Sequence, residues 1–223
     1  MKRDNTNQVG IIKFFVILAA LYLAINIALQ AVIILFTDIQ FTDKNVSLFS
    51  WISAGLSVYI LVLYISKWNI KHALSLSCIK NCSVKSYLLA FIVAITYVFF
   101  SALIFGVSPN EIISRDHSLD ALLDNLLYII ILTVIVPIYE EIIFRGILFD
   151  YANSKLNPIT SSILLSALFS AIHPQHYGYM AISAFTFSLI LYIFRWKLNS
   201  ISPGILIHIT YNFVSFIIFG RAS

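Results

Sequence analysis

Glu140, Glu141 and Arg145 lie in the middle of an apolar run, ILTVIVPIYEEIIFRGILF. A charged side chain at the centre of a bilayer costs at least about 2.5 kcal/mol, so such residues usually mark function. A glutamate four residues before an arginine can pair with it on one helix face. Glu140 points about 100° away from Glu141 around the helix. We therefore expect Glu141 and Arg145 to form a structural pair and Glu140 to be available as an acid or base.

Two further polar pairs interrupt apolar runs. His173 follows Phe169 by four residues, and Asn212 follows His208 by four, which places each pair on one helix face. A glutamate and imidazoles can transfer protons, and imidazole or amide N–H groups can stabilise an oxyanion. A zinc site is the alternative chemistry, because one Glu and two His are a known ligand set. The HExxH spacing, which would place two ligands and a base on one helix, is absent.

The depth of these residues in a membrane indicates which of them can meet. If the fourth and fifth apolar runs form a hairpin that turns near Asn157, Glu140 and His173 lie at nearly equal distances from the turn. At about 1.5 Å per residue their depths agree within a few ångströms. His208 lies only about 8–9 Å into its own helix on the same scale, so we expect it to be shallower. These residues and Asn212 can share a pocket only if the helix that carries His208 is tilted or begins at a different residue.

The composition predicts the elements that carry these residues. Of 223 residues, 60% are hydrophobic and 11% are charged, whereas soluble domains have about a quarter charged residues. We therefore expect an integral membrane protein whose fold is an all-α bundle of transmembrane helices. A bilayer span needs about 20 apolar residues. Seven candidate spans are present, over 11–36, 47–66, 87–107, 121–150, 159–173, 178–194 and 203–219.

The charge of +4 does not indicate a nucleic-acid partner, because most Lys and Arg residues fall in loops between apolar runs. Their bias towards alternate loops is an orientation signal that places the N-terminus in the cytoplasm. Cys78 and Cys82 then fall in a cytoplasmic loop, where a reducing compartment favours two thiols over a disulfide or a metal site.

Three motifs occur in order on successive spans: EExxxR (Glu140, Glu141, Arg145), FxxxH (Phe169, His173) and HxxxN (His208, Asn212). In this combination the chain resembles the CPBP family of intramembrane proteases, which are glutamic endopeptidases also called the type II CAAX prenyl endopeptidase or Abi family. The resemblance covers roughly residues 121–219. It suggests an N-terminal three-span segment over 1–120 and a four-span catalytic core over 121–223.

The resemblance implies a metal-independent glutamate protease that needs no cofactor. By position, Glu140 would activate water, His173 would hold and polarise it, and His208 and Asn212 would stabilise the oxyanion. Glu141, Arg145 and Phe169 would shape the site. The substrate would be a peptide or a membrane-associated protein, cleaved at the cytoplasmic side of the lipid bilayer.

A second hypothesis is a protein that acts by binding, with or without proteolysis. Bacterial members of the family include bacteriocin self-immunity proteins and regulators of membrane sensors, and this chain resembles them in size. Such a protein would bind a membrane protein partner. This likeness points to the bacterial plasma membrane as its location.

Overall fold

The structure is a computed structural model, and it describes residues 11–36, 43–67, 69, 78–105, 126–172 and 179–219. Every regular element in these ranges is a helix, which confirms the predicted all-α class. The seven apolar runs each correspond to a helical segment, with ends within a few residues of the predicted ones. The segments are α1 (Ile11–Phe36), α2 (Asp43–Ile65), α4 (Val84–Phe105), a fourth helix over 126–153, α10 (Pro158–Ala171), α11 (Tyr179–Leu198) and α12 (Ser202–Phe219).

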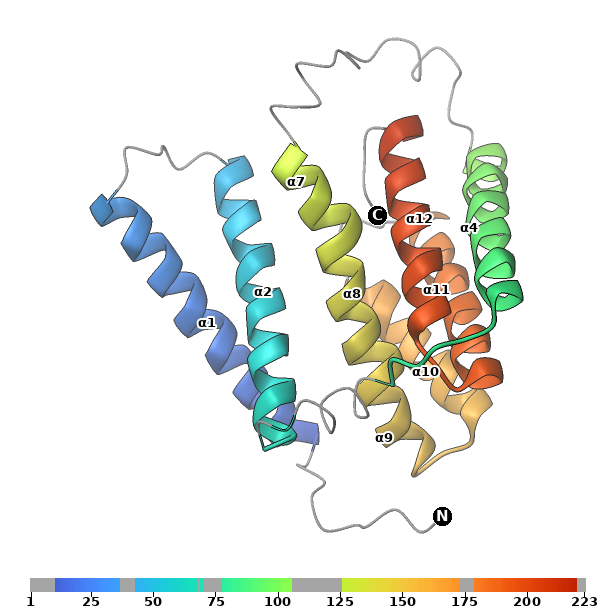
Figure 1. Ribbon diagram of the computed structural model, residues 1–223, viewed down its shortest axis with the longest axis horizontal. Coiled ribbons are helices and arrows are strands. Elements are labelled where there is room, and N and C mark those ends of the chain that lie inside the picture. The colour runs from blue at the N-terminus through green and yellow to red at the C-terminus, as the bar shows by residue number, and fades with distance from the viewer. Residues whose placement is uncertain are drawn as a thin grey trace. The chain divides into compact units, whose positions relative to one another are not determined.

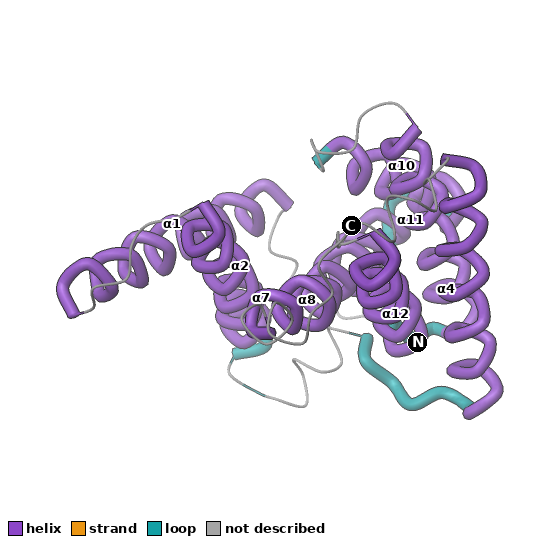
Figure 2. The backbone as a smooth tube through the Cα atoms, turned by 90° about the horizontal axis from the view of Figure 1, so that it is seen from above, coloured by secondary structure: helices purple, strands orange, loops and turns teal. Residues whose placement is uncertain are grey.

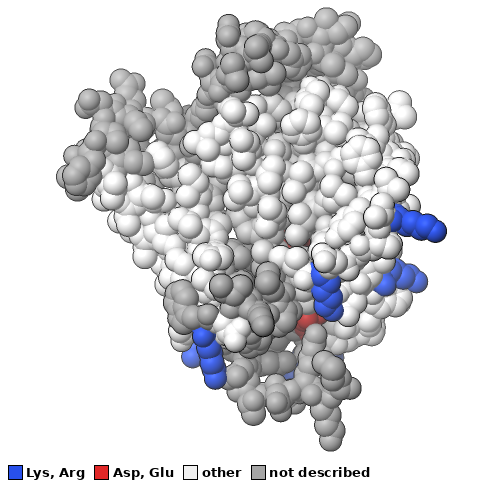
Figure 3. Space-filling model, viewed as in Figure 1, with Lys and Arg blue, Asp and Glu red and all other residues white. Residues whose placement is uncertain are grey.

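Three of the described helices are long and apolar enough to cross a membrane: Val84–Ile104, Leu126–Asn153 and Ala181–Leu198. Shorter apolar helices occupy the other four predicted spans, at Val16–Val32, Phe49–Ile65, Pro158–Ala171 and Ser202–Ile218. The protein is therefore an integral membrane helix bundle. Figure 3 shows few charged side chains on one face of the described residues, most of whose surface is uncharged.

The chain divides into two compact units, Met1–Ala73 and Leu74–Ser223. In the first unit, α1 packs against α2. Asn26 of α1 donates to the Ser53 hydroxyl of α2 at 3.4 Å and accepts from Gln30 at 2.6 Å. Polar contacts of this kind hold helices together where the surroundings are apolar.

In the second unit, α12 lies between α4 and the fourth helix (Figures 1 and 2). Helix α10 packs against α11, and α11 also contacts α12 and the fourth helix. Small residues of α4, Ala90 and Ala94, are fully buried against large residues of α11 and α12, including Leu191 and Ile207. The predicted division at residue 120 stays a prediction, although α4 packs within the C-terminal unit.

The fourth helix alternates between α and π geometry. It consists of α7 (Leu126–Ile130), the π-helical η2 (Ile131–Ile135), α8 (Val136–Glu141), the π-helical η3 (Ile142–Leu148) and α9 (Phe149–Asn153). The first π segment ends just before Pro137, which has no amide to donate. Such π segments are frequent at functional sites. Here they flank the short α8 segment that carries Glu140 and Glu141.

Candidate active site

Glu141 is the centre of a buried polar cluster in the second unit. Its side chain is 0% exposed, and its Oε1 accepts a hydrogen bond from Arg145 Nη1 at 2.9 Å. The pairing predicted from the four-residue spacing is therefore present. Arg145 is also 0% exposed, so the two opposite charges are buried together, which lowers the cost of burying either one.

The Arg145 guanidinium is held by three further side chains. Nη2 donates to the Ser188 hydroxyl of α11 at 2.8 Å. The rings of Phe169 and Tyr192 lie 4.7 and 4.8 Å from its central carbon, where a cation is attracted to an aromatic face. Phe169, predicted to shape the site, thus packs on the arginine that neutralises Glu141.

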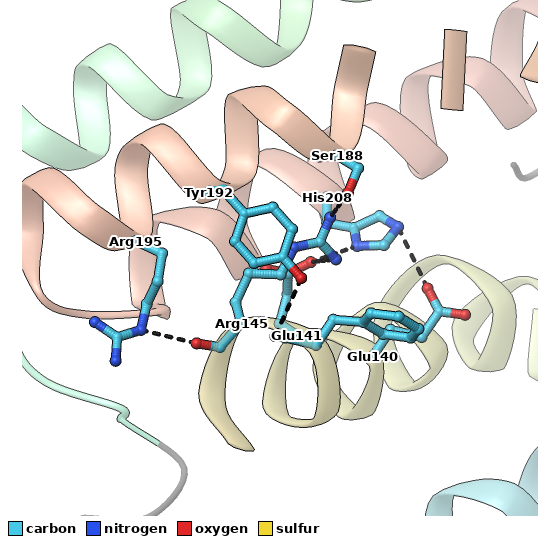
Figure 4. Close-up of polar contacts among 8 residues, drawn as sticks. Glu140, Glu141, Arg145, Ser188, Tyr192, Arg195 and His208 are labelled. Atoms are coloured by element: carbon cyan, nitrogen blue, oxygen red, sulfur yellow. Dashed lines mark hydrogen bonds and ion pairs between the residues drawn. The ribbon is translucent and has the colours of Figure 1, made fainter. Parts of the chain in front are cut away.

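His208 lies between the two glutamates, with one ring nitrogen towards each (Figure 4). Its Nδ1 is 3.0 Å from Glu141 Oε1, and its Nε2 is 3.7 Å from Glu140 Oε2. The rings of Phe169 and Phe187 pack near the imidazole, with centroids 6.2 and 5.3 Å away. The shallow position of His208 in its own helix therefore does not prevent it from reaching the glutamates of the fourth helix.

The contact with Glu141 fixes which nitrogen of His208 carries a proton. Glu141 Oε1 already accepts from Arg145 and is an acceptor. With Glu141 ionised by its pairing with Arg145, we assign Nδ1 as the donor to it, and Nε2 is the nitrogen presented to Glu140. A carboxylate that holds an imidazole by Nδ1–H in this way sets its orientation and stabilises its protonated form.

Asn212 lies one turn beyond His208 on α12 and is 0% exposed. Its Nδ2 donates to the Leu132 carbonyl in the π-helical segment η2, at 3.2 Å. A carboxamide nitrogen carries two hydrogens, so this bond engages one of them and holds the side chain against the fourth helix. The HxxxN motif thus contacts the fourth helix at two levels, through His208 and through Asn212.

His173 lies outside the described residues, so its predicted place beside Glu140 stays a prediction. Within the described part of the chain, no group of three His, Cys, Asp or Glu residues is arranged to hold a metal ion.

Three residues of α11 that were not singled out in the sequence hold the η3 segment. Ser188, Tyr192 and Arg195 are spaced by four and three residues, so they lie on one helix face. Ser188 binds the Arg145 side chain, Tyr192 Oη donates to the Phe144 carbonyl at 3.2 Å, and Arg195 Nε donates to the Arg145 carbonyl at 2.8 Å. We call these three residues the α11 clamp. Their spacing was the available signal, but backbone acceptors cannot be read from a sequence.

The side chain of Arg195 is buried, at 4% exposure. Its Nη2 donates to Asp150 Oδ1 at 2.6 Å and to Cys78 Sγ at 3.2 Å. Cys78 and Cys82 are both free thiols in the structure. Burial, followed by the nearby Asp150 carboxylate, raises the pKa of the Cys78 thiol above its ordinary value.

The fold and these contacts define a helical membrane protein with a buried glutamate–histidine site. Residues 122–214 match the family described as Type II CAAX prenyl endopeptidase Rce1-like. The match spans the part of the chain that carries the three motifs, and it confirms the resemblance found in them. The family implies a CAAX-type intramembrane protease, and hence a hydrolase with a protein or peptide substrate. Comparisons with curated proteins and with solved structures give no match.

Proposed function

We propose that the protein is an intramembrane endopeptidase in which Glu140 activates water as a general base. The observation that carries the proposal is the buried carboxylate of Glu140, which lies 3.7 Å from His208 Nε2 on a helix long enough to span a membrane. Arg145 is committed to Glu141, so these two residues support the site, while Glu140 and His208 Nε2 face each other.

The charges of the cluster suggest where its mobile proton resides. Glu140 and Glu141 contribute two negative charges, and Arg145 contributes one positive charge. One additional proton on either Glu140 or His208 Nε2 makes these four side chains neutral in sum, which an apolar environment favours. The proposed reaction starts from the form in which His208 carries this proton, because a general base must be ionised before it can accept one. Glu140 is then ionised as a base, and Nε2–H is a donor for an oxyanion.

The reaction follows from this assignment. Glu140 takes a proton from water while the water oxygen bonds to the scissile carbonyl carbon. The carbonyl oxygen becomes an oxyanion, which accepts from His208 Nε2–H and the Asn212 amide. Glu140 then returns its proton to the amide nitrogen, the carbon–nitrogen bond breaks, and a carboxylic acid and an amine leave. In the role implied by the family motif, His173 would hold the water.

The exposed basic residues of the second unit support a cytoplasmic orientation of the site. All four exposed Lys or Arg residues in its described part, Lys80, Lys85, Lys155 and Lys197, lie at the end formed by the start of α4, the α9–α10 turn and the end of α11. Basic residues collect on the cytoplasmic side of membrane proteins. We therefore propose that peptide or membrane-associated protein substrates reach the site from the cytoplasm and that the N-terminus lies on the same side.

The experiment uses the full chain in lipid vesicles with a panel of membrane-anchored peptides, and mass spectrometry identifies the cleaved bonds. We expect cleavage by the wild type and by Tyr97→Phe, which alters a buried hydrogen bond between α4 and α11 outside the site. We expect Glu140→Gln to lower the rate of cleavage by about 10²–10⁴-fold. Cleavage by Glu140→Gln within about threefold of the wild-type rate would contradict the proposal, and loss of cleavage after exhaustive chelation would favour the metal alternative.

The binding hypothesis makes a different prediction for the same variant. A self-immunity or sensor-regulating protein that acts by binding alone keeps its cellular effect after Glu140→Gln, as long as the variant inserts in the membrane. A protease loses it. A cellular assay of Glu140→Gln, with Tyr97→Phe as the control, therefore separates the two functions.

A further inference from the structure

Gly204 lies in the first turn of α12, one helical turn before His208, and it faces the Glu141 side chain. A β-carbon placed on Gly204 would lie 3.0 Å from Glu141 Oε2 and 3.8 Å from both Glu141 Cδ and Leu191 Cδ2. A carbon–oxygen distance of 3.0 Å is closer than nine in ten real contacts of a β-carbon. Because Gly204 has only a hydrogen in place of a β-carbon, the Glu141 carboxylate has room to lie against it.

The backbone conformation does not explain a glycine at this position. Gly204 is helical and does not adopt the left-handed region that favours glycine. Glycine is also a poorer helix former than alanine, so the helix itself does not favour it here. The space required by Glu141 is the physical reason that remains.

The two oxygens of Glu141 have different surroundings. Oε1 accepts from Arg145 and from His208 Nδ1, whereas Oε2 is buried and has no hydrogen-bond partner among the described residues. The position of Oε2 is therefore set by packing against Gly204. The partial positive charge at the start of α12 also favours a carboxylate there.

We propose that Gly204 is a positioning residue for the reaction. It admits the Glu141 carboxylate between itself and His208, and it thereby fixes the hydrogen bond that orients the imidazole. This inference rests on the proposed function, because the orientation of His208 matters for catalysis only if Nε2 acts at the reacting carbonyl. An alanine at this position must displace the carboxylate by a few tenths of an ångström, which tilts the imidazole.

A double-mutant cycle on kcat tests the proposal in the full-length protein. We expect Gly204→Ala to lower kcat about tenfold with little change in KM, since misplacement of about 1 Å costs roughly 100-fold. Glu141→Asp shortens the side chain and withdraws the oxygen from Gly204. The effect of Gly204→Ala should therefore fall below about twofold when Glu141→Asp is already present, because coupled sites are not additive. An equal effect of Gly204→Ala in both backgrounds overturns the proposal.

Two further readouts separate this proposal from the proposed function. In ¹⁵N-histidine-labelled protein, Gly204→Ala should shift the Nδ1 resonance of His208. An unchanged resonance overturns the inference even if no substrate is found. If Gly204→Ala prevents folding, the double variant with Glu141→Asp should fold again, and failure to recover it also overturns the inference. Absence of any Glu140-dependent cleavage by the wild type rejects only the proposed function.

Discussion

His208 Nδ1 lies 3.0 Å from Oε1 of Glu141, the same oxygen that accepts a hydrogen bond from Arg145. This shared acceptor joins the EExxxR motif of the fourth helix to the HxxxN motif of α12. The two glutamates therefore differ in their contacts: Glu141 is bound to a cation and an imidazole, whereas Glu140 faces the opposite nitrogen of the same ring.

The first prediction concerns the protons of His208. Because Nδ1 faces a carboxylate that is already paired with Arg145, we expect Nδ1 to be protonated, and the proposed mechanism also requires a proton on Nε2. ¹⁵N NMR of histidine-labelled protein in detergent micelles measures both nitrogens, and His208→Gln assigns the signals. A deprotonated Nδ1 would contradict the arrangement, and a deprotonated Nε2 would place the mobile proton on Glu140.

The second prediction concerns the stability of the Glu141–Arg145 pair. Both side chains are 0% exposed, so Arg145→Met leaves a buried negative charge and should destabilise the protein by about 3–5 kcal/mol. The double variant Glu141→Gln/Arg145→Met should recover much of that loss, because it removes both charges. Reversible unfolding in mixed micelles measures the four proteins of the cycle. Purely additive losses would show that the pair is not energetically coupled.

The third prediction concerns the α11 clamp. Tyr192→Phe removes only the hydroxyl that donates to the Phe144 carbonyl, so it should cost about 0.5–1.5 kcal/mol of stability. Arg195→Gln removes charge-assisted bonds to Asp150 and should cost more, about 1.5–3 kcal/mol.

Hydrogen exchange locates the effect of these clamp variants. We expect faster exchange of the η3 amides (Ile142–Leu148) in Arg195→Gln, with α4 unchanged as the internal control. Equal acceleration throughout the second unit would mean that the clamp does not act on η3 in particular.

The fourth prediction concerns the thiol of Cys78. Its burial raises the pKa, so the thiol stays protonated at neutral pH and should react with maleimide far more slowly than the partly exposed Cys82. Variants with one cysteine each, Cys78→Ser and Cys82→Ser, separate the two rates. A faster reaction at Cys78 would contradict its buried position.

The raised pKa of the Cys78 thiol also predicts how the stability of the folded state changes with pH. A folded-state pKa above the unfolded value of about 9.0 means that the native state holds the proton more tightly. Its contribution to stability is therefore fully present below pH 9.0 and is lost as the pH rises towards the folded pKa. Cys78→Ser should flatten this part of the stability–pH curve, whereas Cys82→Ser should leave it unchanged.

Helix positions and the Glu141–Arg145 pair could be predicted from the sequence, because both depend on local spacing. Apolar runs of membrane length predict helices, and residues four apart share a helix face. The contact of His208 with the fourth helix was harder to predict. Counting residues from the start of α12 gives the depth of His208 within that helix. It does not give the position of the fourth helix along α12, which decides whether His208 and the glutamates meet.

The α11 clamp and the packing of Gly204 could not be predicted, for a different reason. Tyr192 and Arg195 bind backbone carbonyls, which every residue carries, so no partner residue marks them in the sequence. Gly204 makes room for the Glu141 side chain because it has no β-carbon. Glu141 lies 63 positions earlier in the chain, so only the packed structure brings the two residues together.

The kinetic constants of Glu140→Gln on an identified peptide substrate test the central claim most directly. Glutamine keeps the size and polarity of the side chain but cannot accept a proton from water. General-base catalysis contributes about 10²–10⁴-fold, so we predict a fall in kcat of that size with KM little changed, while Tyr97→Phe retains wild-type kcat. A kcat within about threefold of the wild type, in a variant that is folded and inserted in the membrane, would contradict the assignment of Glu140 as the base.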